Sequence, residues 1–321
     1  MRKYIIFFGL IMLSLGCSNS AATPTPSLQP VAVQLKWLHQ TQFAGFYVAE
    51  QEGYYAEQGI EVTLAPVDFA RPSGIEQVLE QEYQFGIASA ADLIIARSEG
   101  KPVKAVAVIY RIDPYIFLVK PDAGINSPYD FQGHKVAYTP GVVNIYQAVA
   151  NTLNLDLTQI EQVPYDGFDL WECWEVAPVC LNYATNGPVI LDMAGEAYRV
   201  FWPGEFGISW YGDVLFTTDQ LIKDQPDLVE HFVQATLQGW QKAVGNPDLA
   251  VQITLKYDEN LDPAFQTQAM NVSLPLIDTG ELPIGVMASE GWQTLYDTLL
   301  KQDIISEQIE VEDLYTNQFV R

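Results

Sequence analysis

Residues 31–64 read VAVQLKWLHQTQFAGFYVAEQEGYYAEQGIEVTL, and this stretch decides the fold class of the 321-residue chain. A β-branched run at residues 31–35 predicts a strand, and the amphipathic segment 44–58, which ends at Gly59, predicts a helix. A second β-branched run follows at residues 60–64. A strand, a helix and a strand in close succession indicate the α/β class.

The same alternation continues along the chain. Further strands are predicted at residues 84–88, 103–109, 115–119, 135–138, 160–164 and 179–183, and helices at 74–81, 90–99, 143–153 and 189–194. Longer helices are predicted at residues 226–245, 247–256, 263–272 and 288–301, and residues 302–321 are expected to form a final strand and tail. This order favours largely parallel strands covered by helices on both faces.

Two crossovers, near Val119 and Val214, divide the predicted elements into two lobes. We expect a first lobe from residues 31–119 and 215–321, the latter including the C-terminal helices, and a second lobe from residues 120–214. A ligand cleft is expected between them, because loops and helix N-termini converge at the carboxyl ends of strands.

The N-terminus has the pattern of an export signal. Arg2 and Lys3 precede twelve apolar residues, too few to span a bilayer, and Gly16 and Cys17 follow. We expect a signal peptide at residues 1–16, lipid attachment at Cys17 and a tether at residues 17–30, on the extracytoplasmic face of the cell membrane. LSLGC, residues 13–17, resembles a bacterial lipobox except at Ser14, where leucine is usual. A secreted protein with an incidental Cys17 is the alternative.

Net charge and the numbers of histidines and cysteines bear on partners, cofactors and disulfides. The net charge of -24 argues against nucleic acid and disfavours an anionic ligand. No metal or other cofactor is expected, since the three histidines show no ligand spacing. Cys173 and Cys180 lie seven residues apart, which permits a disulfide in an exported protein; two free buried thiols are the alternative.

Several segments resemble a known family. They are LKWLHQTQFAGFYVA (35–49), EGYYAEQGIEV (52–62), GIASAAD (86–92), YGDVLFTT (211–218) and LQGW (237–240). They are similar to the pyrimidine- and riboflavin-binding receptors of ABC importers, which share a fold with fungal thiamine-pyrimidine synthases. The resemblance implies an α/β, two-lobed periplasmic-binding-protein-like fold (type II) and a monomer that delivers a heteroaromatic ligand to an ABC permease and its ATPase.

Candidate binding residues follow from the loops at strand ends. Trp37 offers a π-face to a flat ligand, and Gln40 and Gln42 offer amide donors and acceptors. The expected ligand-binding set is Trp37, Gln40, Gln42, Phe43, Tyr47, Ser89, Asp92, Gly141, Asn144, Tyr183, Asn186, Trp210, Tyr211 and Asp213. Alternative interpretations remain for part of this set: Trp37 and Phe43 as core, Gln40 and Gln42 as solvated side chains, Ser89 as a helix cap, Gly141 as a tight turn, and Trp210 and Tyr211 as hinge packing.

One position bears on the choice of ligand. Gly187 lies where an acidic residue usually stands in the family, and a carboxylate there would suit an aminopyrimidine. Loss of the carboxylate opens space for a larger ligand, which favours riboflavin over formylaminopyrimidine or hydroxymethylpyrimidine. A pyrimidine synthase, with His39 near the corresponding region, and a sensor module are the remaining alternatives. No catalytic residue is expected for a receptor.

Overall fold

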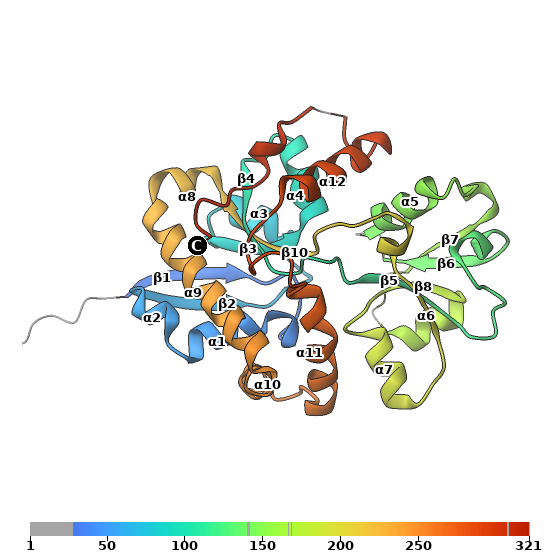
Figure 1. Cartoon of the computed structure of the whole chain (residues 1–321), viewed down its shortest axis with the longest axis horizontal. Coiled ribbons are helices and arrows are strands. Elements are labelled where there is room, and N and C mark those ends of the chain that lie inside the picture. Colours follow the sequence, from blue (N-terminus) through green and yellow to red (C-terminus); the bar gives the residue numbers. More distant parts are fainter. Residues whose placement is uncertain (1–27, 140–141, 166, 168, 307, 321) are drawn as a thin grey trace, which may run out of the picture.

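The computed structural model describes residues 28–139, 142–165, 167, 169–306 and 308–320. Cys17, the predicted signal peptide, residues 17–27 of the predicted tether and Gly141 lie outside these residues. The described strands, which lie between Gln29 and Thr218, form two five-stranded sheets. Figure 1 shows the two sheets side by side as separate lobes. No helix within the described residues is both long enough and apolar enough to span a bilayer.

The first lobe contains the sheet β2-β1-β3-β10-β4. Its strands are β1 (Gln29–Gln34), β2 (Ile60–Ala65), β3 (Phe85–Ser89), β4 (Val103–Val108) and β10 (Asp213–Thr218). Its helices are α1 (Ala44–Gln51), α2 (Tyr54–Glu57), α3 (Gly74–Leu79), α4 (Ala90–Ser98), α8 (Asp219–Asp224), α9 (Pro226–Gly245), α10 (Pro247–Thr254), α11 (Pro263–Ile277) and α12 (Ser289–Lys301). Strand β1 runs parallel to β2 and β3, whereas β10 runs antiparallel to β3 and β4.

The second lobe contains the sheet β7-β6-β8-β5-β9. Its elements are β5 (Tyr115–Val119), β6 (Lys135–Tyr138), α5 (Val143–Thr152), β7 (Glu161–Pro164), α6 (Leu170–Val176), β8 (Val179–Tyr183), α7 (Gly187–Ala194) and β9 (Arg199–Phe201). The sequence assigned residues 115–119 to the first lobe. Strand β5 instead pairs antiparallel with β8 and β9, so the lobe boundary lies before Tyr115. Both sheets are therefore mixed rather than largely parallel.

Other differences from the sequence-based expectations have local causes. The predicted helix 44–58 is two helices, α1 and α2, because Gly53 adopts a left-handed conformation between them (φ 83°). Residues 302–321 contain the short 3-10 helix η6 (Val311–Asp313) and an isolated bridge from Tyr315 to Ala105 in place of a strand. Helices α6 and α8 and strands β9 and β10 were not anticipated.

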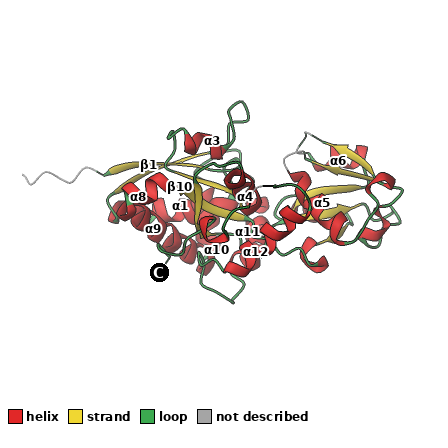
Figure 2. Cartoon of the chain, turned by 90° about the horizontal axis from the view of Figure 1, so that it is seen from above, coloured by secondary structure: helices red, strands yellow, loops and turns green. Residues whose placement is uncertain are grey.

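Helices cover both faces of the first sheet (Figure 2). On one face Val33 and Ile87 pack with Trp240 of α9, and on the other Ala88 and Val214 pack with residues of α4 and α12. This second apolar cluster extends into the second lobe, where it includes Val136 of β6. The two lobes therefore share part of one core.

A disulfide joins Cys173 of α6 to Cys180 of β8, with the two Cα atoms 6.4 Å apart. Of the two interpretations that the sequence left open for these cysteines, the structure has the disulfide. It ties α6 to the sheet of the second lobe.

Candidate ligand-binding cleft

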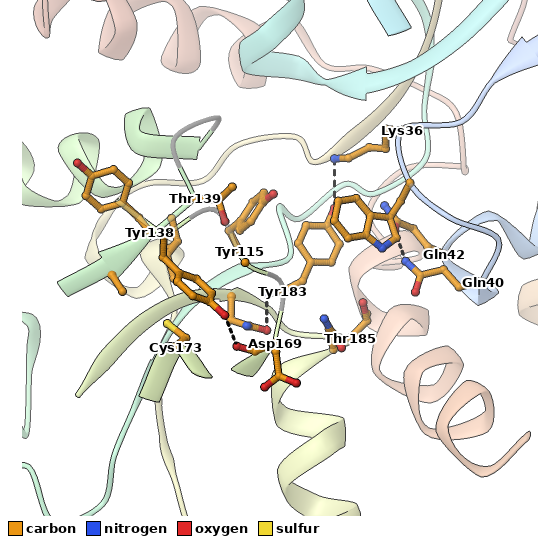
Figure 3. Close-up of a pocket in the computed structure, with 17 residues that line it drawn as sticks. Lys36, Gln40, Gln42, Tyr115, Tyr138, Thr139, Asp169, Cys173, Tyr183 and Thr185 are labelled. Atoms are coloured by element: carbon orange, nitrogen blue, oxygen red, sulfur yellow. Dashed lines mark hydrogen bonds between the residues drawn. The ribbon is translucent and has the colours of Figure 1, made fainter. Parts of the chain in front are cut away.

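A cleft that is partly open to solvent lies between the two lobes. The first lobe contributes Lys36, Trp37, Gln40 and Gln42 from the loop that follows β1. The second lobe contributes residues at or after the carboxyl ends of β6, β7 and β8, such as Thr139. Figure 3 shows these two groups facing each other, with the rings of Tyr115 and Tyr183 between them.

Five aromatic side chains line this cleft: Trp37, Tyr115, Tyr138, Tyr165 and Tyr183. Tyr115 and Tyr183 are paired across β5 and β8, and their rings meet edge to face with centroids 4.7 Å apart. Trp37 meets Phe69 edge to face at 5.4 Å. Rings held in this way can stack on a flat ligand without first losing much conformational freedom.

A hydrogen-bonded network lies at the edge of the cleft on the side of the first lobe. The Asp213 carboxylate accepts hydrogen bonds from Lys36 Nζ (2.7 Å), Gln42 Nε2 (2.6 Å) and the Tyr183 hydroxyl (3.0 Å). Gln40 in turn donates to Gln42 Oε1 at 2.7 Å. The Asp213 side chain is only 2% exposed, so these donors replace the water that a carboxylate would otherwise bind.

Burial and neighbouring charges shift the pKa values of several titratable groups here. Burial alone would lower the pKa of Lys36, but the neighbouring Asp213 carboxylate offsets this effect and the pKa is raised. Lys36 is therefore charged and paired. Burial also raises the pKa of Tyr183, and it raises the pKa of Asp113, just before β5, to about 7. The cleft thus presents a neutralised ion pair rather than a free charge on the side of the first lobe.

Two polar side chains of the second lobe that line the cleft, Asp169 and Asn182, are engaged in local structure. Asp169 Oδ1 caps α6 by accepting from the amides of Trp171 and Glu172, at 2.7 and 3.1 Å. Asn182 Oδ1 accepts from the amides of Tyr183 and Gly187, both at 2.9 Å. These bonds fix the orientation of two side chains that line the cleft.

Gly187 does not line the cleft, although the sequence suggested that its small size enlarges the binding site. It is buried as the first residue of α7, and a Cβ atom there would meet Asn182 and, at 2.8 Å, Leu118. Packing within the second lobe therefore accounts for this glycine, and the expectation of added ligand space at this position is wrong.

The structure brings five of the expected residues into the cleft: Trp37, Gln40, Gln42, Tyr183 and Asn186. Asp213 does not line the cleft itself, but its carboxylate accepts hydrogen bonds from three lining residues, Lys36, Gln42 and Tyr183.

The other expected residues lie elsewhere, for identifiable reasons. Phe43 and Tyr47 are fully buried in the core of the first lobe. Ser89 caps α4 by accepting from the amide of Asp92, and neither residue lines the cleft. Asn144 is buried in the first turn of α5.

The two aromatic residues before β10 also differ from expectation. Trp210 lines a second cavity, beside the crossovers between the lobes, together with Ile112, Trp202 and Leu276. Tyr211 is buried against Trp292, and its hydroxyl accepts from the amide of Ala288 at 2.8 Å. Both therefore follow the alternative interpretation, packing near the hinge.

Several lining residues were missed by the sequence analysis: Lys36, Tyr115, Ala137, Tyr138, Thr139, Tyr165, Gly167, Asp169, Cys173, Leu181, Asn182 and Thr185. A usable signal was present for part of this set. Tyr138 and Tyr183 end β6 and β8, and Tyr165 directly follows β7. A tyrosine at the carboxyl end of three neighbouring strands predicts an aromatic wall at one edge of the sheet.

Residues 40–250 match the model of the NMT1/THI5 like family, and the chain belongs to this family. It is 26% identical to the riboflavin-binding protein RibY of Chloroflexus aurantiacus, with 100% of this chain and 98% of the relative aligned. It is also 26% identical to a formylaminopyrimidine-binding protein of Halalkalibacterium halodurans, over 98% of each chain. A 4-amino-5-hydroxymethyl-2-methylpyrimidine phosphate synthase of Legionella pneumophila is 22% identical, over 90% of this chain and 92% of that protein.

Among solved structures, the aliphatic sulphonate binding protein SsuA of Escherichia coli superposes with a TM-score of 0.70 at 12% identity, over 90% of this chain and 92% of SsuA. The likeness confirms the two-lobed periplasmic-binding-protein-like fold (type II) expected from the sequence.

No histidine is among the described residues that line the cleft. His39 Nδ1 is instead bonded to the Tyr47 hydroxyl at 2.9 Å. The residues that the structure describes contain no cluster of three or more histidine, cysteine or acidic side chains suited to a metal ion. Cys173 lines the cleft as half of a disulfide, and a disulfide sulfur is not a thiolate nucleophile.

Proposed function

We propose that this chain is the substrate-binding lipoprotein of an ABC importer and that it binds riboflavin between its lobes. The observation that carries the proposal is the interlobe cleft lined by five aromatic rings. Alignment with the riboflavin-binding protein RibY over the whole chain supports it. The protein acts as a receptor: it captures the vitamin and presents it to a permease, with no bond made or broken.

The chemistry of the cleft suits this ligand. The isoalloxazine ring of riboflavin is flat, tricyclic and uncharged, so it can stack on several aromatic faces at once. Lys36 is the one cationic side chain among the described residues that line the cleft, and it is paired with Asp213, so the lining presents no unpaired cation to attract an anion. Amide and hydroxyl side chains, including Gln40, Thr185 and Asn186, offer hydrogen bonds to the ring edge and the polyol tail.

A thiamine pyrimidine precursor, formylaminopyrimidine or hydroxymethylpyrimidine, is the second candidate ligand. The carboxylate of Asp169 lines the cleft and could pair with an aminopyrimidine edge. The identity to a formylaminopyrimidine-binding protein equals that to RibY. Because Asp169 Oδ1 already accepts two amide hydrogen bonds, we favour riboflavin.

The ligand can be identified directly. We would purify residues 18–321, which contain every described strand together with its pairing partners, and titrate them with riboflavin while recording flavin fluorescence. Quenching with sub-micromolar affinity is expected, and calorimetry with each pyrimidine measures the alternatives. Tight binding of a pyrimidine with no response to riboflavin would transfer the proposal to the second ligand. Turnover of either compound would instead show an enzyme.

The anchor is tested separately on the full chain. Lipid attachment at Cys17 predicts that the protein fractionates with membranes and that Cys17→Ser releases it. Equal fractionation of the two proteins would exclude the proposed anchor without affecting the ligand proposal.

A further inference from the structure

The hydroxyl of Tyr183 reaches from one lobe to the other. Tyr183 ends β8 in the second sheet, whereas Asp213 begins β10 in the first. The 3.0 Å bond between them therefore crosses the cleft, and Lys36 Nζ lies 3.4 Å from the same hydroxyl.

The two sides of this contact differ in how firmly they are held. The backbone carbonyl of Asp213 accepts from the amides of Ile109 and Tyr110, and its carboxylate is bound by Lys36 and Gln42 of its own lobe. When the lobes separate, the carboxylate loses the Tyr183 donor but keeps the other two. Opening thus leaves the Asp213 carboxylate paired within its own lobe, and the contact can break and form again.

The ring of Tyr183 belongs to the binding surface at the same time. It lines the cleft, meets Tyr115 edge to face, and has the Lys36 ammonium 5.5 Å from its centroid. A flat ligand packed on this ring restricts the side chain to the orientation in which its hydroxyl meets Asp213. Ring contact and interlobe contact are then favoured together.

We propose that Tyr183 is a positioning residue that couples ligand capture to lobe closure, through the hydrogen bond from its hydroxyl to the Asp213 carboxylate. The identity of the ligand rests on the proposed function, but the interlobe contact does not. Lys36 and Gln42 act through Asp213, by holding the acceptor in place in both the open and the closed arrangement.

The test compares wild type with Tyr183→Phe, which keeps the ring and removes the hydroxyl. The control is Tyr257→Phe, which removes a hydroxyl bonded to Glu50 within the first lobe, outside the cleft. Glu57→Cys and Gln162→Cys place one spin label on an exposed position of each lobe. The distance between the two labels, measured in residues 18–321, reports how far the lobes are apart. Non-reducing buffer preserves the disulfide between Cys173 and Cys180. Stopped-flow fluorescence measures riboflavin dissociation.

Loss of a hydrogen bond to a charged acceptor changes an equilibrium constant by about tenfold or more. We expect Tyr183→Phe to shift the distance distribution toward the open form and to accelerate dissociation about tenfold, with no change in Tyr257→Phe. Unchanged distances and dissociation in Tyr183→Phe, or equal changes in both variants, would overturn the inference. If wild type fails to bind riboflavin, the proposed function fails, and the distances without ligand still decide the interlobe contact.

Discussion

At the residue scale, Trp37 is the ring that the first lobe contributes to the cleft. It meets Phe69 edge to face, with an angle of 78° between the two ring planes, and this contact orients the Trp37 ring. We expect Trp37→Ala to weaken riboflavin binding about fivefold or more, because stacking on one aromatic side chain contributes roughly 1 to 3 kcal/mol. Fluorescence titration of residues 18–321 measures this.

Two further variants make the result specific to stacking. Trp37→Phe keeps a smaller ring and should lose less affinity than Trp37→Ala. Leu38→Ala changes the next side chain, which is 47% exposed and outside the cleft lining, and should bind as wild type does. Wild-type affinity in Trp37→Ala would remove Trp37 from the binding surface.

Asp113 makes stability depend on pH. Burial raises its pKa to about 7 in the folded protein, against 3.8 for an unperturbed aspartate. Between these values the folded state binds more protons than the unfolded state, so this group's contribution to stability is lost as the pH rises from about 4 to 7. Asn at this position cannot ionise, and its side-chain oxygen can still accept from the Tyr115 amide, which donates to Asp113 at 2.8 Å.

We therefore expect Asp113→Asn to melt a few degrees above wild type at pH 8 and at nearly the same temperature at pH 4. Thermal unfolding followed by circular dichroism across this range gives the comparison. Asp122→Asn, on the surface, is the control. A difference from wild type that stays constant from pH 4 to pH 8 would show that ionisation of Asp113 is not its cause.

At the scale of elements, the contact of α1 with α9 depends on glycine. A Cβ atom on Gly239 of α9 would collide with the Gly45 carbonyl oxygen and with Ala49 of α1. A Cβ atom on Gly45 would in turn collide with Trp240. The two helices therefore approach more closely than side chains would allow, and Trp240 becomes fully buried.

Gly239→Ala should lower the free energy of unfolding by about 1 to 3 kcal/mol, the usual cost of overpacking a core. Urea denaturation measures it. Gly245→Ala lies in the same helix, and nothing stands within 4 Å of the added Cβ atom, so this variant should not destabilise the protein. Equal stabilities of the two variants would argue that the α1 and α9 contact can relax.

The elements also show what the sequence could and could not determine. Local patterns placed β6, β8 and α9 at their observed bounds, because each is bounded by turn signals or by proline. The hydrophobic periodicity of a segment does not show which distant strand it pairs with. Strand β5 was therefore assigned to the wrong lobe, although its bounds were correct.

The same limit applies to the cleft. The loop after β1 was identified by its own residues, Trp37, Gln40 and Gln42. The role of Lys36 depends on Asp213, 177 residues away along the chain. Phe43 and Tyr47 were expected to bind ligand because neighbours in sequence do, but helical geometry turns both into the core.

At the scale of the whole molecule, the two lobes share an apolar core. One apolar cluster includes Val108 of the first sheet, Val136 of the second and Trp292 of α12. Helix α12 contacts both α4 and α5, so it bridges the lobes. Because unfolding either lobe exposes part of this shared core, we expect a single cooperative thermal transition for residues 18–321.

Ligand binding should move that whole transition. Riboflavin at about one hundred times its dissociation constant stabilises the folded state by about 2.7 kcal/mol, a shift of several degrees in Tm, if only the folded two-lobed form binds it. Circular dichroism and tryptophan fluorescence should report the same midpoint with and without ligand. Leu295→Ala, which opens a cavity in α12 at a fully buried position, should lower that common midpoint. Two separate transitions, of which Leu295→Ala lowers only one, would show that the lobes unfold independently despite their shared core.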